Sequence, residues 1–173
     1  MNVRVAAALA LALLPLAAGF PGASVATTPL PRCHTADLGV SLGRESGAAG
    51  SIEREVALRN RSSHTCFVFG YAGFGLENAR HHVKPSWVTW GSTFAQRDPG
   101  RHRVVLRPGR AAFANLAWND VPVGGERSCG GASTWLEVTP PDERQYRLVR
   151  FGGIVCNHGH LTATALSRSR PSR

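Results

Sequence analysis

The chain carries four cysteines, a residue type with a wide range of chemistry. They are Cys33, Cys66, Cys129 and Cys156. No C-x-x-C pair occurs, so the spacing indicates neither a dithiol redox centre nor a zinc site built on such pairs. An even number of cysteines in an exported chain predicts disulfides, and the N-terminal residues discussed below predict export. Cys66 is therefore expected to be oxidised and unable to act as a thiolate nucleophile.

The positions of the cysteines favour one of the three possible pairings. Cys33 and Cys66 lie at equal distances in sequence from the turn signal at residues 47–50. Cys129 and Cys156 are likewise centred on a turn signal, which follows a pair of prolines. Residues equidistant from a hairpin turn face each other across antiparallel strands, at a separation that suits a disulfide. The sequence therefore predicts the disulfides Cys33–Cys66 and Cys129–Cys156.

Two pairs of histidines could bind a metal ion. His81 and His82 are adjacent, and His158 and His160 form an H-x-H pair, which on a strand would place both imidazoles on one face. Such a face suits zinc or copper. A third ligand is needed, and the sequence places none of the other candidates nearby; these are His34, His64 and His102. We expect no metal and no cofactor, and keep a metal-binding extracellular domain that uses histidines as an alternative.

The sequence does not indicate the motifs of hydrolytic enzymes. Residues 39–43 read G-V-S-L-G, but they overlap a predicted strand with no helix after it and so do not predict a G-x-S-x-G elbow, and no H-E-x-x-H pair occurs. Glu53 and Glu55 share one face of a predicted strand, but the neighbouring Arg54 and Arg59 make this a solvated face rather than a glycosidase pair. We therefore expect no catalytic activity, with a hydrolase that has an unrecognised site as the second alternative.

Three tryptophans are candidates for stacking on sugar rings. They are Trp87, Trp90 and Trp135, of which the first two flank a predicted loop. Burial in a core is the commoner environment for each of them. Burial is therefore the leading expectation for each of them, and sugar stacking is the alternative.

The N-terminal residues predict a secretory signal peptide over residues 1–26. Arg4 supplies the positive charge, residues 5–18 are almost wholly apolar, and small residues at 24–26 place cleavage between Ala26 and Thr27. The apolar run is shorter than the roughly 20 residues that span a bilayer. We expect a monomeric protein that is secreted, extracellular or associated with the cell envelope, without a transmembrane segment in the mature chain.

Short alternating runs bounded by turn residues predict an all-β protein. No helix of convincing length follows the leader, and several short strands with turn chemistry between them favour an antiparallel immunoglobulin-like β-sandwich with two disulfides. The predicted strands are 36–42, 52–60, 66–76, 83–90, 103–106, 111–118, 134–139, 146–151 and 161–166. The predicted organisation is a linker at 27–32, the sandwich domain at 33–166 and a basic, disordered tail at 167–173.

The charge of the chain indicates the kind of partner that it would meet. Twenty basic residues against eleven acidic ones give a net charge of +9. Such a protein is attracted to the anionic polymers or lipids of an envelope, although a solvated charge that only keeps the chain soluble is the simpler interpretation. The leading expectation is a non-catalytic module that binds an unknown envelope polymer, lipid or protein, with no nucleic acid as partner.

Several motifs resemble one family of extracellular domains. Asn60, Ser62 and Cys66, followed by Gly70-Tyr71-Ala72-Gly73, are similar to the N-x-S-x-x-C-x-x-x-G-Y-P-G signature of domain of unknown function 4232, although Ala72 replaces the usual proline. The run 105–112 is similar to the L-x-P-G-x-x-A strand pair of that family, and residues 129–156 to its closing half. The resemblance implies a secreted or lipid-anchored actinobacterial β-sandwich with disulfides. It implies no activity.

Overall fold

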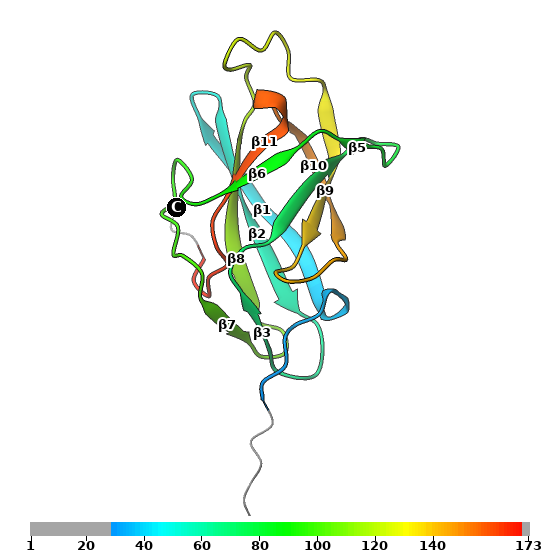
Figure 1. Ribbon diagram of the computed structural model, residues 1–173, viewed down its shortest axis with the longest axis vertical. Helices are drawn as coiled ribbons and strands as arrows, with labels where there is room; N and C mark the ends of the chain where they lie inside the picture. Colours follow the sequence, from blue (N-terminus) through cyan, green and yellow to red (C-terminus); the bar gives the residue numbers. More distant parts are fainter. Residues whose placement is uncertain (1–28, 171–173) are drawn as a thin grey trace, which may run out of the picture.

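The computed structural model describes residues 29–170, and within them the chain is all-β (Figure 1). Two single-turn 3-10 helices are the only helical segments in this range. The elements are η1 (Thr35–Asp37), β1 (Leu38–Ala48), β2 (Ser51–Asn60), β3 (Cys66–Phe69), β4 (Gly73–Glu77), β5 (Val83–Lys84), β6 (Trp87–Trp90), β7 (Arg103–Leu106), β8 (Ala111–Asn119), β9 (Ala132–Thr139), β10 (Arg147–Ile154), η2 (Asn157–Gly159) and β11 (His160–Ala163). Neither short helix is long and apolar enough to cross a membrane.

The strands form two sheets and a two-stranded ribbon. One sheet has the order β1-β2-β8-β11-β6, the other has the order β10-β9-β4-β5, and β3 pairs with β7. Every pair of strands is antiparallel except β6 and β11, which run parallel with Trp87 opposite His160. Figure 1 places β6 and β11 in the upper half of the molecule and the β3–β7 ribbon at its lower end.

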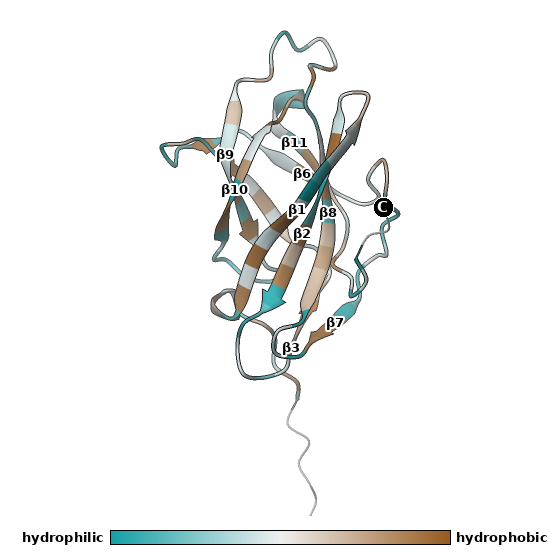
Figure 2. Ribbon diagram, turned by 180° about the vertical axis from the view of Figure 1, so that it is seen from behind, coloured by the Kyte–Doolittle hydropathy of each residue, from teal (hydrophilic) through white to brown (hydrophobic). Residues whose placement is uncertain are grey.

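Alternation along the strands builds a single apolar core between the sheets. On β8 the residues Ala112, Ala114, Leu116 and Trp118 are at most 4% exposed, which confirms the inward face predicted from the sequence. They pack in one cluster with buried side chains of the second sheet and of the ribbon, such as Leu136 and Leu106. The banding of apolar and polar residues along the strands is visible in Figure 2. The structure confirms the all-β class with antiparallel sheets.

Two predicted strands are each divided between sheets. The run 66–76 breaks into β3 and β4 at Gly70, whose φ of 87° lies in the left-handed region and whose carbonyl accepts a hydrogen bond from the N–H of Leu166. The run 83–90 breaks at Pro85 into β5 and β6, because proline has no N–H to donate to a ladder. Both breaks move the chain from one sheet or ribbon to another.

Both predicted disulfides are formed, Cys33–Cys66 and Cys129–Cys156, and the described residues contain no free cysteine. The second lies just beyond the paired ends of the β9–β10 hairpin, as the spacing argument requires. The first does not continue the β1–β2 hairpin. The segment before Cys33 instead runs parallel to β3, since Phe67 and Cys33 each donate an N–H to the other segment. The hairpin explanation of this first pairing is therefore wrong.

The chain ends differ in part from the predicted organisation. The proposed cleavage site between Ala26 and Thr27 lies outside the described residues. Within the predicted linker, Pro31 accepts a hydrogen bond from Phe67, so this end of the linker is bound to the domain. The tail at 167–173 was expected to be disordered, yet Ser167 exchanges two backbone hydrogen bonds with Phe113 of β8, and residues 168–170 are placed beside it.

Candidate functional site

Asn60, the first residue of the N-x-S-x-x-C run, fastens the turn that leads to Cys66. Its side chain is fully buried, and its amide nitrogen donates to the carbonyls of His64 at 2.8 Å and Leu106 at 3.0 Å. Its side-chain oxygen accepts from the N–H and the hydroxyl of Ser62. All polar positions of this amide are occupied by the protein itself. The motif therefore builds the fold and leaves nothing open for a ligand.

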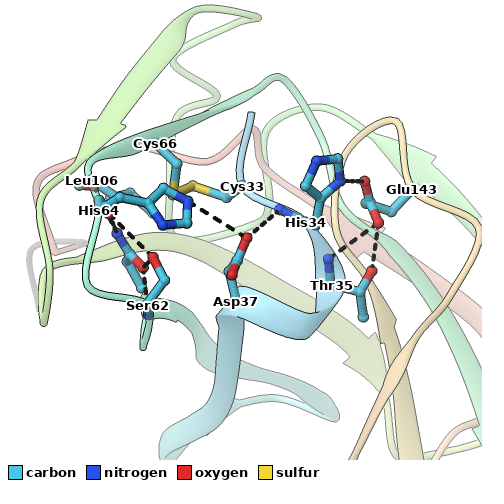
Figure 3. Close-up of a disulfide and its surroundings, with 10 residues drawn as sticks. Cys33, His34, Thr35, Asp37, Ser62, His64, Cys66, Leu106 and Glu143 are labelled. Atoms are coloured by element: carbon cyan, nitrogen blue, oxygen red, sulfur yellow. Dashed lines mark hydrogen bonds and ion pairs between the residues drawn. A yellow bond between two sulfur atoms is a disulfide. The ribbon is translucent and has the colours of Figure 1, made fainter. Parts of the chain in front are cut away.

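The other side of the same disulfide is also occupied by internal contacts. Glu143 accepts hydrogen bonds from the N–H of Thr35 at 3.1 Å and from its hydroxyl at 3.0 Å, and it lies 3.0 Å from Nδ1 of His34 (Figure 3). Burial raises the pKa of Glu143, but the hydrogen bonds from Thr35 and His34 together outweigh it and hold the pKa below its usual value. These contacts join η1 to the turn between β9 and β10.

A groove at the end of the five-stranded sheet gathers arginines. Its volume is about 450 Å³, and its apolar lining comes from β7 and β8. These apolar residues are Val105, Leu106, Ala111 and Phe113. Five arginines surround them, from β2, from the turn between β7 and β8, and from the C-terminal segment: Arg59, Arg107, Arg110, Arg168 and Arg170. We call this feature the arginine groove.

Local contacts hold two of these arginines in place. Arg59 donates through Nη1 to the carbonyl of Gly109, the left-handed residue of the turn. The guanidinium of Arg170 lies 5.2 Å from the ring centre of Phe113, and its Nε is 3.9 Å from Glu55. This distant contact is the only ion pair formed by the five arginines within the described residues. Positive charge in the groove is thus largely uncompensated.

The other three arginines of the groove are free to bind. Within residues 29–170, the side chains of Arg107, Arg110 and Arg168 form no hydrogen bond and no ion pair, and all three residues are exposed. A guanidinium offers five donors in a planar fork that matches carboxylate and phosphate oxygens. The groove therefore has the chemistry of an anion-binding surface.

A second hollow, of about 510 Å³, lies beside η1 and also contains arginines. Here Arg147 donates to the carbonyl of Thr35 at 3.1 Å and to that of Ala36 at 3.1 Å. Its guanidinium thus satisfies backbone groups of the protein. The guanidinium of Arg147 is thus already bonded to the protein, whereas three guanidinium groups of the arginine groove are not.

Of the three tryptophans considered as sugar-binding candidates, Trp87 has the most distinctive environment. Its indole stacks on the imidazole of His160 with ring centres 3.7 Å apart and planes 10° from parallel. The residue is still 51% exposed, so the indole face away from His160 is open to solvent. Burial, the commoner environment, is the wrong expectation for Trp87. We call the stacked pair the Trp87 platform.

Hydrogen bonds at both ring nitrogens fix the imidazole of the platform. The side-chain amide of Asn157 lies 3.2 Å from Nδ1 of His160, and the hydroxyl of Thr89 lies 2.9 Å from Nε2. An amide nitrogen can only donate, so Nδ1 accepts and Nε2 carries the proton. Burial lowers the pKa of His160, which agrees with a neutral ring.

The turn η2 places His160 against Trp87. Asn157, His158 and Gly159 all have φ between 53° and 82°, a left-handed run that is costly for the two residues with side chains. The carboxylate of Glu126 offsets this cost by accepting from the N–H groups of Asn157 at 2.7 Å and His158 at 3.2 Å. A Cβ on Gly159 would lie 2.1 Å from the carbonyl oxygen of Pro85, so only glycine permits this approach of η2 to the segment just before β6.

The other two tryptophans serve the protein itself. Trp90 is 54% exposed, against the expectation of burial, but its indole N–H donates to the carbonyl of Ala72 at 3.1 Å. Trp135 is half-buried on the second sheet, where the ring of His81 stacks on it at 5.2 Å. Neither offers a supported, open indole face comparable to that of Trp87.

The histidines are not brought together. His34, His64, His81 and His158 each lie beside a carboxylate, which is a different one for each ring: Glu143, Asp37, Glu77 and Glu126. Within the described residues, the only group of three or more potential metal ligands is Glu126 with Cys129 and Cys156. Those two sulfurs are bonded to each other and offer no thiolate. The geometry does not favour the metal-binding alternative.

A carboxyl pair that the sequence analysis missed lies on the outer face of the second sheet. Glu77 of β4 is 3% exposed, and it shares a hydrogen bond with Glu137 of β9. Burial, then this hydrogen bond and the charge of Glu77, raise the pKa of Glu137. Sixty residues separate the two positions, and only the pairing of β4 with β9 shows that they meet. Carboxyls in direct contact leave no room for the water or sugar that a glycosidase pair requires.

Comparison with known protein families identifies the fold family. The family model described as "Domain of unknown function (DUF4232)" matches residues 33–167. The chain belongs to this family. No curated protein and no solved structure matched the chain.

Two segments that resemble the DUF4232 signature have distinct places in the structure. The N-x-S-x-x-C run surrounds Asn60 and is fully used inside the protein. The L-x-P-G run forms the turn in which the N–H of Arg110 donates to the carbonyl of Arg107 at 3.0 Å, and this turn is one wall of the arginine groove. In this DUF4232 chain the second motif therefore also presents two arginines to solvent.

Proposed function

We propose that this protein is a secreted, non-catalytic module that binds an anionic polymer of the cell envelope in its arginine groove. The observation that carries the proposal is the cluster of five arginines around an apolar floor, with one distant carboxylate as counterion among residues 29–170. The two disulfides support an oxidising, extracellular location. The carboxyl pair is in direct contact, and the described residues offer no supported metal site, so binding is the function that best suits the geometry.

Charge and shape together favour a polymer. The arginines line an open groove rather than an enclosed pocket, and they come from three parts of the chain that meet only in the fold. Guanidinium groups form paired hydrogen bonds with phosphate or carboxylate oxygens, and several such contacts along a chain add to one another. Binding of this kind weakens as salt screens the charges, over a Debye length of about 10 Å at 0.1 M.

The test compares two variants that remove the same charge at different places. Arg107→Ser/Arg110→Ser removes two arginines from the groove, and Arg80→Ser/Arg127→Ser removes two exposed arginines elsewhere. Calorimetric titration with inorganic polyphosphate and with hyaluronate at low salt should show binding by the wild type. The groove variant should bind both about tenfold more weakly or worse, and the control should stay within about twofold.

Three outcomes contradict the proposal. One is that the wild type binds neither polymer. Another is that both double variants lose the same amount of affinity, since binding would then follow net charge alone. Wild-type protein that binds vesicles of phosphatidylglycerol but neither polymer would point to a lipid surface as the partner in place of a polymer.

A further inference from the structure

The Trp87 platform and the arginine groove lie on the same face of the five-stranded sheet. Leu161 and Trp118 are paired and point inward to the core, so the neighbouring His160 and its partner Trp87 point outward. On β8, Phe113 is an odd number of residues from Trp118 and therefore also points outward. Phe113 is part of the lining of the arginine groove.

The two features are separated along the strands. From His160, one residue beyond the Leu161–Trp118 pair, to Phe113 is six residues, or about 20 Å. Loop 91–100 is fastened to the middle of this face by the hydrogen bond from Thr93 to Glu53, so a ligand spanning the two would pass along the surface of this loop. Only an extended chain could reach both features at once.

The chemistry of the platform differs from that of the groove. Trp87 presents an open indole face, while His160 behind it is neutral and the hydroxyl of Thr89 is already bonded to it. A flat, uncharged aromatic ring with a fixed orientation attracts the C–H face of a pyranose, because its π-electrons present negative charge to the polarised C–H groups. Two hydrogen bonds hold the supporting imidazole in place, so little conformational freedom is lost when a sugar stacks.

We infer that the anionic polymer bound by this protein is an acidic polysaccharide, of which one sugar ring stacks on Trp87 while its acidic groups lie in the arginine groove. This inference rests on the proposed function and adds to it the class of the polymer. The open face of Trp87, its support by His160 and its position on the same sheet face as the groove carry it.

The test uses one polymer with sugar rings and one without. Hyaluronate contains pyranoses and carboxylates, whereas inorganic polyphosphate is anionic and has no ring. Trp87→Ala should weaken hyaluronate binding about tenfold, the size expected for one lost stacking contact, and leave polyphosphate binding within twofold. Trp87→Phe should recover part of the affinity for hyaluronate.

A matched control removes an exposed aromatic residue from the turn between β9 and β10, which belong to the other sheet. Tyr146 is 46% exposed, and Tyr146→Ala should bind both polymers like the wild type. Unchanged near-ultraviolet circular dichroism outside the tryptophan contribution, with intact disulfides, would show that Trp87→Ala is folded.

The outcomes separate the inference from the proposed function. Suppose that the groove variant binds both polymers more weakly, but that Trp87→Ala changes the binding of neither or weakens the binding of both equally. The sugar platform is then wrong and the proposed function stands. If the groove variant binds like the wild type while Trp87→Ala selectively loses hyaluronate, the proposed function is wrong and the platform is supported. Wild-type protein that binds hyaluronate no more tightly per anionic group than polyphosphate would overturn the inference.

Discussion

Single carboxyl groups fasten one loop to the outer surface of the five-stranded sheet. Glu53, 4% exposed, accepts hydrogen bonds from the side-chain amide of Asn115 and from the hydroxyl of Thr93, so it ties loop 91–100 to β8. Burial raises the pKa of Glu53, and the hydrogen bond from Thr93 only partly opposes this. Asp98 in the same loop accepts from the N–H of Ala165 at 2.8 Å and from the hydroxyl of Tyr71. One loop is thereby bound to the sheet and to the C-terminal segment.

The carboxyl pair on the second sheet leads to a prediction about pH. The folded state raises the pKa of Glu137 above its ordinary value of 4.5, through burial and the proximity of Glu77. The contribution of this group to stability is therefore most favourable below pH 4.5 and is lost as the pH rises through the folded pKa. Glu137→Gln keeps a hydrogen bond to Glu77 without the charge. It should raise the free energy of unfolding at pH 7 by about 1 kcal/mol or less.

Thermal melts from pH 4 to pH 8 would measure this effect. The difference in Tm between Glu137→Gln and the wild type should be small at pH 4, grow as the pH rises, and then level off. Glu45→Gln serves as the control, because Glu45 is an exposed carboxylate 4.0 Å from Arg54. A pH-independent difference, or a variant that is less stable at pH 7, would contradict the prediction.

At the scale of the elements, local sequence patterns predicted where the strands lie better than they predicted which strands pair with one another. Alternation located β2 and β8 closely, because both keep one face against the core over nine or ten residues. The breaks at Gly70 and Pro85 were visible as residue types, but the sequence does not say that the chain changes sheets there. The parallel pairing of β6 with β11 joins residues 73 positions apart, Trp87 and His160, which the sequence suggested for sugar stacking and for metal binding separately. Their stacking is a tertiary property.

The turn between β2 and β3 depends on the side chain of Asn60, which links β2 to this turn and to β7. Asn60→Ala would remove the donors to the carbonyls of His64 and Leu106 and the acceptor for Ser62. Because Asn60 is fully buried, the carbonyl of Leu106 would lose a buried hydrogen bond, and the turn would lose the bonds from Asn60 to His64 and Ser62, at a cost of about 2–3 kcal/mol. Chemical denaturation should show this loss as a lower midpoint with an unchanged slope.

A milder variant separates the hydrogen bonds made by the side chain of Asn60 from general disruption of the turn. Ser62→Ala removes one hydroxyl that bonds to Asn60 and His64 but keeps the backbone N–H that also bonds to Asn60. It should cost about 1 kcal/mol. If Asn60→Ala were no more destabilising than Ser62→Ala, the side chain of Asn60 would not be the link between these strands.

At the scale of the whole molecule, the net charge of +9 was known from composition but its placement was not. The five groove arginines lie at positions 59, 107, 110, 168 and 170, and no local pattern connects them. The arginines at 168 and 170 lie in the tail that was expected to be disordered. Nothing in this short basic segment indicates that Ser167 pairs with β8. The even number of cysteines predicted that disulfides form. Their spacing about a turn explains the pairing only for Cys129–Cys156, where a hairpin does join the two cysteines.

The two disulfides should stabilise the whole domain by comparable amounts. They close loops with sequence separations of 33 and 27 residues, for which the chain-entropy model gives about 3.5 kcal/mol each. Cys129→Ser/Cys156→Ser should therefore lower the free energy of unfolding by about 3.5 kcal/mol, and Cys33→Ser/Cys66→Ser by a similar amount or more, since both sulfurs of that pair are buried in the core. Urea titration of both variants under the same conditions measures this. A loss below about 1 kcal/mol in either would contradict the prediction.

The parallel contact between the segment before Cys33 and β3 also determines how the domain would respond to mechanical force. Tension applied from the N-terminal side passes through the Cys33–Cys66 bond directly into β3 and bypasses the β1–β2 hairpin. The chain between Cys33 and Cys66, which have a sequence separation of 33, cannot be extended while the bond is intact. Reduction would release them as roughly 110 Å of slack chain, at about 3.4 Å per residue. While this disulfide is intact, tension applied from the N-terminal side of the domain therefore does not stretch the β1–β2 hairpin.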